Sequence, residues 1–69
     1  MTELRKKVKK YLQENKEFIK IRSIAVLSEV SYAKLYGFVN DSRYRDLIDS
    51  EVSAIDAVLV RIYNYEKFD

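Results

Sequence analysis

The side chains best suited to chemistry in this chain lie between Ser31 and Asn40, in the segment SYAKLYGFVN. If this segment is a helix, residues spaced i, i+1, i+4, i+5 and i+8 share one outward stripe. The stripe consists of Tyr32, Ala33, Tyr36, Gly37 and Asn40. It offers hydrogen bonds, aromatic contact and close backbone approach, which is the chemistry of recognition.

Catalytic chemistry has little support in the composition, because the chain has no His and no Cys. Acid-base work by imidazole, metal sites built on His or thiolate ligands, and Ser-His triads are therefore excluded. The carboxylates show no pairing beyond ordinary surface spacing. We expect a protein that is not an enzyme and that uses no cofactor and no metal.

The length and composition favour one small helical domain over residues 1–69, with 48% hydrophobic residues, one Gly and no Pro. No segment approaches the roughly 20 apolar residues of a membrane span, and the N-terminus lacks the apolar core of a signal peptide. We therefore expect a cytoplasmic protein without a membrane partner.

The charges are distributed unevenly along the chain. Residues 1–22 hold eight Lys and Arg against three Glu, a net charge of +5, whereas residues 23–69 hold five against eight acids, a net charge of −3. Such a molecule would orient in an electrostatic field. The alternative is that the basic run is simply a solvated face.

The apolar spacing predicts helices that must position the stripe. The first runs from Thr2 to about Glu14, the second covers about 22–29, and the third runs from a Ser31 N-cap to Asn40. The side chains expected to be buried in these helices recur every three or four residues. They are Leu4, Val8, Tyr11, Leu12, Ile24, Ala25, Val30, Leu35 and Phe38.

A polar connection at 41–43 follows, with a short helical turn expected through Tyr44, Leu47 and Ile48. Asp49 or Ser50 can cap a last helix that runs to about Tyr65. Its core-like positions are Val52, Ile55, Val58, Leu59 and Ile62.

The segment IAVLSEVSYAKLYGFVN, with its flanking helices, resembles the lambda-repressor-like helix-turn-helix family, also called Cro/repressor or XRE. The likeness covers about 50 residues and lies mostly in hydrophobic spacing, with Ala25, the Val30-Ser31 pair and Leu35 as the better identities. It implies a compact all-α domain of four to five helices, with the motif at about 21–40. The third helix would then enter the major groove of double-stranded DNA.

The resemblance implies two sets of contacts to DNA. Base edges would be touched by Tyr32, Ala33, Tyr36 and Gly37. Phosphates would be touched by Lys20, Arg22, Ser31, Lys34, Asn40 and Arg43.

The chain departs from the family at three points. Glu29 stands in the turn where the family usually has Gly, and a left-handed conformation there would cost about 1–2 kcal/mol. Ile21 replaces a polar residue that often touches phosphate, so Lys20, Arg22 or backbone N–H groups would have to supply that contact. The stripe also lacks the Arg and Gln side chains that usually read bases.

Several stripe residues have a second interpretation. Gly37 could allow tight packing against a neighbouring helix, and Asn40 could be a left-handed C-cap. Lys34 could be plainly solvated, and Arg43 could pair with the acids near it. Tyr32 and Tyr36 could anchor a protein partner, since Tyr is enriched at interface hot spots.

The C-terminal segment carries large apolar groups, which predict a homodimer contact. The residues of this contact are Val60, Tyr63, Tyr65 and Phe68. The alternative is that the segment folds back onto the first helix. A dimer would suit DNA binding, because one short recognition helix touches few base pairs.

The sequence thus favours a sequence-specific DNA-binding transcriptional regulator of the Cro or repressor kind found in phages and mobile elements. The alternative is a protein-binding module on the same helical frame, such as an antirepressor or an inhibitor of a host factor. The acidic second half of the chain favours that alternative.

Overall fold

A computed structural model describes residues 2–40, 47–63 and 65 of the chain. It contains helices α1 (Thr2–Asn15), α2 (Ile21–Ser28), α3 (Tyr32–Val39) and α4 (Asp49–Ile62), and the described residues include no strand. The all-α class predicted from the sequence is therefore confirmed. None of the helices within the described ranges is long and apolar enough to cross a membrane.

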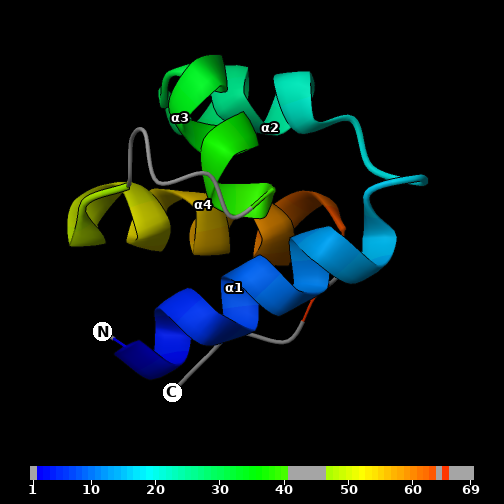
Figure 1. Ribbon diagram of the computed structural model, residues 1–69. Helices are drawn as coiled ribbons and strands as arrows, with labels where there is room; N and C mark the ends of the chain where they lie inside the picture. The colour runs from blue at the N-terminus through cyan, green and yellow to red at the C-terminus, as the bar shows by residue number, and fades with distance from the viewer. Residues whose placement is uncertain (1, 41–46, 64, 66–69) are drawn as a thin grey trace.

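The core lies where α4 crosses between α1 on one side and the α2–α3 pair on the other (Figure 1). α3 packs against α2 and α1. The side chains that meet in this core are those of Leu4, Val8, Leu12, Ile24, Ala25, Val30, Leu35, Phe38, Leu47, Val52, Ile55, Val58 and Leu59, together with Ile19, Val39 and Tyr65. The three- and four-residue spacing of the sequence therefore located most of the core. Ile62 is an exception, because it ends α4 with its side chain exposed.

The turn between α2 and α3 is closed by Glu29, whose backbone is left-handed with φ 58° and ψ 37°. The Glu29 N–H donates to the Val26 carbonyl at 3.2 Å, and the Val30 N–H donates to the Ala25 carbonyl at 2.9 Å. This pair of bonds is the Schellman motif. Val30 and Ala25, which one of the bonds joins, are both buried in the core. Glu29 therefore has the left-handed conformation that was expected for it, although it is not a glycine.

The ends of α3 lie where the sequence put them, but the capping differs. Ser31 precedes the helix in an extended conformation and its hydroxyl makes no capping hydrogen bond. Asn40 follows the helix with φ −97° and ψ 15°, so it is not a left-handed cap. Its side-chain Nδ2 instead donates to the Tyr36 carbonyl at 2.8 Å, satisfying one of the last carbonyls of the helix.

The N-cap of α4 is not one of the two residues predicted for it. Ile48, rather than Asp49 or Ser50, is the N-cap, and its N–H donates to Glu51 Oε1 at 2.9 Å. This is half of a capping box, since Ile48 has no side-chain acceptor for the return bond. The helix ends at Ile62, three residues before the predicted end. The turn expected around Tyr44 and the loop residue Arg43 lie outside the described residues.

Tyr65, one of the residues predicted to lie at a dimer contact, is buried against the body of the protein. Only 8% of Tyr65 is exposed, and its ring meets that of Tyr11 edge-on, with centroids 4.9 Å apart and planes at 67°. Lys7 Nζ lies 4.5 Å from the centroid of the Tyr65 ring. The Tyr65 ring therefore packs inside the chain, as the fold-back alternative expects for this residue.

Two more residues of the predicted dimer contact are also partly covered by the protein itself. Val60 and Tyr63 are partly buried and pack against the core. Phe68 lies outside the described residues.

Candidate functional site

The outer side of α3 carries two exposed tyrosines directly above buried anchors. Tyr32 and Tyr36 are exposed, and their ring centroids are 5.9 Å apart with the planes at 50°. Leu35 and Phe38, on the opposite side of the helix, are buried in the core. Because these anchors fix the rotation of α3, the tyrosines form a rigid aromatic patch rather than a loose pair.

Ala33 and Asn40 are exposed as the sequence predicted, but the placement of Gly37 on the outward stripe is wrong. Gly37 is buried, beside the core residue Phe38. The stripe is narrower than a free helix would allow because α3 packs against both α2 and α1. The burial supports the packing interpretation of this glycine.

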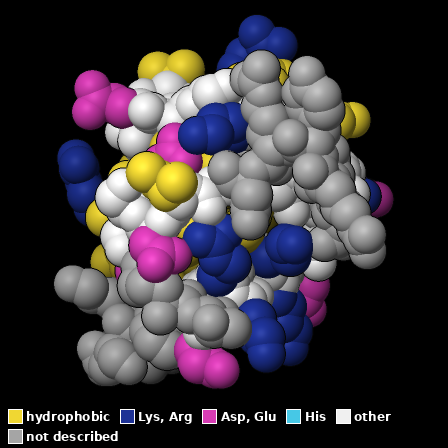
Figure 2. Space-filling model, turned by 60° about the vertical axis from the view of Figure 1, so that its left-hand side comes forward, with side chains coloured by type: hydrophobic (Ala, Val, Ile, Leu, Met, Phe, Trp, Pro, Cys, Tyr) yellow, Lys and Arg dark blue, Asp and Glu magenta, His cyan; other side chains and the backbone are white. Residues whose placement is uncertain are grey.

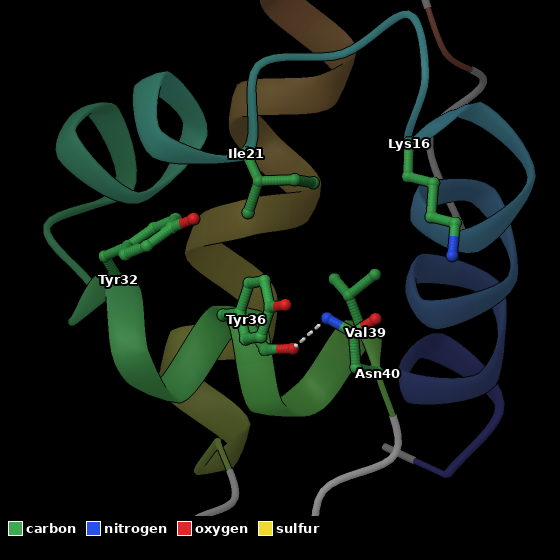
Figure 3. Close-up of a pocket in the computed structure, with 6 residues that line it drawn as sticks. All are labelled: Lys16, Ile21, Tyr32, Tyr36, Val39 and Asn40. Atoms are coloured by element: carbon green, nitrogen blue, oxygen red, sulfur yellow. Dashed lines mark hydrogen bonds between the residues drawn. The ribbon is translucent and has the colours of Figure 1, made fainter.

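A shallow pocket of about 260 Å³ lies between α3, the start of α2 and the end of α1. It is lined by Lys16, Ile21, Tyr32, Tyr36, Val39 and Asn40. Figure 3 shows the two tyrosine rings and Ile21 on one side of this hollow and the Lys16 side chain hanging from α1 on the other. The pocket thus combines aromatic faces, phenol hydroxyls and one ammonium group.

Lys16 is a member of this site that the sequence did not identify. It follows the end of α1, a position that by itself signals only a break in the helix. Gln13 Nε2 donates to the Val39 carbonyl at 2.9 Å, which holds the end of α1 against the end of α3. Lys16 comes near the tyrosines through the packing of α1 on α3, which the local sequence does not reveal.

The cations at the start of α2 border the same patch. Lys20 and Arg22 are both exposed. The Arg22 guanidinium carbon lies 4.8 Å from the centroid of the Tyr32 ring, a cation–π contact. A guanidinium stacked on a ring keeps its N–H donors in its own plane, so they can still bind an anion at their edge.

Lys34 is held away from the stripe by an interhelical ion pair. Its Nζ lies 3.1 Å and 3.2 Å from the two carboxylate oxygens of Glu51 on α4. The Ile48 N–H lowers the pKa of the Glu51 carboxyl most, and Lys34 lowers it further against the opposing effect of burial. Lys34 is therefore paired rather than plainly solvated, and a phosphate would have to compete with Glu51 for it.

Charges of both signs share the surface around the helices. Figure 2 shows several Lys and Arg side chains gathered on one face, with Asp and Glu side chains close beside them. Arg5 Nη2, for example, lies 3.0 Å from Asp49 Oδ1, which links α1 to α4. This face is therefore not a uniformly basic surface.

A second exposed feature lies on the outer side of α2, where Arg22, Ser23, Val26 and Leu27 line a shallow hollow of about 390 Å³. Val26 is 71% exposed and Leu27 is 54% exposed. The signal for this stripe was present in the sequence, since the four residues are spaced i, i+1, i+4 and i+5. It was missed because the apolar residues of a short helix are easily assigned to the core.

Within the described ranges, no group of three or more acidic side chains lies close enough to hold a metal ion. What the arrangement can do is bind, through aromatic faces, hydroxyl groups and the cations beside them. Comparisons of the chain with protein families, with curated proteins and with solved structures find no match. The geometry of the α3 face is therefore the basis for assigning a function.

Proposed function

We propose that this protein is a sequence-specific DNA-binding regulator of the Cro or repressor type, which places α3 in the major groove of double-stranded DNA. The observation that carries the proposal is the exposed stripe of Tyr32, Tyr36 and Asn40, bordered by Arg22. The short turn at Glu29 and the buried anchors beneath α3 support it, because a recognition helix must be held rigidly with one face free.

The dimensions of α3 suit this role. An α-helix with its side chains is about 10–12 Å across, and the major groove is about 12 Å wide, so one helix such as α3 fits into it. Tyr32 and Tyr36 would touch thymine methyl groups or phosphates, and Ala33 would permit close approach. Asn40 retains its amide oxygen as an acceptor, since its Nδ2 already donates to Tyr36.

The phosphate contacts in this proposal come from the edges of the stripe. Lys20 and Arg22 lie at the start of α2, and Lys16 reaches the pocket from the end of α1. Ser31, whose hydroxyl makes no capping bond, is available to a phosphate. Such contacts position the helix, whereas the tyrosines would supply what sequence preference there is.

The test is the salt dependence of binding to random duplex DNA, measured by fluorescence anisotropy between about 50 mM and about 200 mM salt. We expect the Lys20→Gln/Arg22→Gln variant to bind all sequences more weakly and to flatten the salt slope by about one to two phosphate equivalents. A Lys6→Gln/Lys10→Gln variant on α1 has the same change in net charge and is the control. Equal slopes for the two variants would refute the proposed phosphate contacts.

A second candidate function is that of a protein-binding module on the same frame. It is favoured by the exposed apolar side chains of Val26, Leu27 and Phe18 and by the charges of both signs on the surface shown in Figure 2. Such a module would show no binding to duplex DNA, or binding without a salt slope, in the experiment above.

A further inference from the structure

The outer stripe of α2 is an apolar surface with opposite charges at its two ends. Val26 and Leu27 project from the middle of the helix, and Ser23 beside them is small. Arg22 lies at the start of the helix and Glu29 directly after its end, and both are exposed. In Figure 1, α2 lies at the edge of the molecule, away from α1.

The spacing of the two charges gives this surface a symmetry. Arg22 lies in the first turn of α2, and Glu29, whose backbone is left-handed, follows its last residue, so opposite charges stand at the two ends of the apolar stripe. When a second copy of such a helix lies antiparallel against the first, positions equally far from the midpoint face each other. The midpoint between Arg22 and Glu29 lies at Ala25 and Val26.

We propose that a second copy of this chain covers the stripe, through antiparallel contact between the two α2 helices around a two-fold axis near Val26. Arg22 of each copy then faces Glu29 of the other, and Val26 and Leu27 are buried between them. The arrangement pairs both charges while removing exposed apolar surface from water. It does not involve the C-terminal residues of the predicted dimer contact, of which Tyr65 is buried within the chain.

One charged side chain and the backbone that carries the other are held in place before any partner arrives. The Arg22 guanidinium lies over the Tyr32 ring, and the Glu29 backbone is fixed by hydrogen bonds to the end of α2. A guanidinium already stacked on a ring loses less side-chain freedom when it pairs. The opposite ends also argue against other occupants, because an acidic segment would meet Glu29 and a basic segment would meet Arg22.

The contact is small, and this sets its strength. Stable protein interfaces bury about 1,200–2,000 Å², whereas α2 has eight residues and is about 12 Å long. The dimer is therefore weak and forms only at high concentration. Its two ion pairs are solvent-exposed, so salt weakens it further.

The experiment is sedimentation equilibrium of the full chain without DNA, from about 20 µM to about 1 mM at low salt. We expect a monomer–dimer equilibrium for the natural chain. Glu29→Arg should raise the dissociation constant at least about tenfold, and Arg22→Glu should do the same. The double variant Arg22→Glu/Glu29→Arg should return to within about threefold of the natural chain, because the charges again face opposites.

Glu17→Arg, which has the same charge change as Glu29→Arg but lies at an exposed position before α2, is the matched control and should leave the dissociation constant unchanged. Circular dichroism confirms that each variant keeps its helices. Any one of three results would overturn the proposal. The natural chain could stay monomeric at the highest concentration, or Glu29→Arg and the control Glu17→Arg could change the dissociation constant equally. The third result is a double variant whose dissociation constant stays as high as those of the single variants. Because no DNA is present, these results are independent of the DNA-binding test.

Discussion

Two tyrosine pairs in this molecule have similar chemistry and opposite surroundings. Tyr32 and Tyr36 form an exposed pair within α3, with Arg22 over one ring. Tyr11 and Tyr65 form a pair between α1 and the C-terminal segment, with Lys7 over one ring. The first pair is 5.9 Å apart and Tyr36 is 55% exposed, whereas the second is 4.9 Å apart and Tyr65 is only 8% exposed.

The difference shows how the same side chain serves recognition in one place and stability in another. The exposed pair depends only on the four-residue spacing of one helix, so it leaves its faces and hydroxyl groups to a partner. The buried pair joins residues 54 positions apart in the sequence and places Tyr65 against α1. Four experiments sharpen this contrast.

The largest effect is expected from Tyr65→Ala, which removes a buried ring that packs against Tyr11 of α1. It should lower the free energy of unfolding by about 3 kcal/mol, in the range of large-to-small changes of buried aromatic residues. Tyr36→Ala, the same change at the exposed pair, should lower it by less than about 0.5 kcal/mol. Urea unfolding followed by circular dichroism measures both values, and equal losses would show that the contrast is wrong.

The converse result is expected for binding. Tyr36→Ala should weaken specific DNA binding by about 1–3 kcal/mol while leaving thermal stability nearly unchanged. Phe18→Ala removes another exposed aromatic ring, from the connection between α1 and α2, and serves as the control. Anisotropy with a selected duplex distinguishes them, and similar losses for both variants would remove Tyr36 from the recognition surface.

The two tyrosine pairs also show which structural features could be predicted from the sequence. Local spacing predicted the exposure of Tyr32 and Tyr36 and the position of Asn40, and the family resemblance implied the left-handed conformation of Glu29. These features depend on residues within one or two helical turns of each other. The core positions in α1 and α4 followed from the same periodicity.

Features that depend on how helices meet were not predictable in this way. Gly37 is buried because α3 packs against two other helices, which no pattern within α3 reveals. Lys34 pairs with Glu51, which is 17 residues away in the sequence. The Tyr65 ring contacts that of Tyr11, which is 54 residues away. Asp56 is likewise buried in α4, although an acid in an apolar stripe is normally expected at the surface.

Alkaline pH should separate the pairs through the Tyr65 hydroxyl. Burial raises the pKa of this hydroxyl well above its usual value near 10, and the Asp56 carboxylate and the Tyr11 hydroxyl raise it further. Above about pH 10 the unfolded chain loses this proton while the folded chain keeps it, so stability falls as pH rises. Below that pH both states are protonated and the effect vanishes.

We therefore expect Tyr65→Phe to remove this part of the alkaline loss, which for one proton reaches at most about 1.4 kcal/mol per pH unit. Urea unfolding of the natural chain and of the variant, between about pH 8 and about pH 11.5, measures the difference. Tyr36→Phe at the exposed pair is the control, and its pH curve should be parallel to that of the natural chain. A parallel curve for Tyr65→Phe as well would contradict the assigned environment.

The smallest effect concerns the cations over the two rings. Lys7→Met keeps the length of the side chain over Tyr65 but removes the charge, and should lower the free energy of unfolding by about 0.5–1 kcal/mol because this contact is partly shielded from water. Arg22→Met over Tyr32 should cost less than about 0.5 kcal/mol, since that contact is exposed and water competes for the guanidinium. Added salt should narrow the difference between the natural chain and Lys7→Met only slightly, because screening acts weakly on partly buried charges. If Arg22→Met is the more destabilising of the two variants, the Arg22 side chain stabilises the packing of α2 on α3. That result would contradict the role of Arg22 as a side chain that is free to bind DNA or a second copy of the chain.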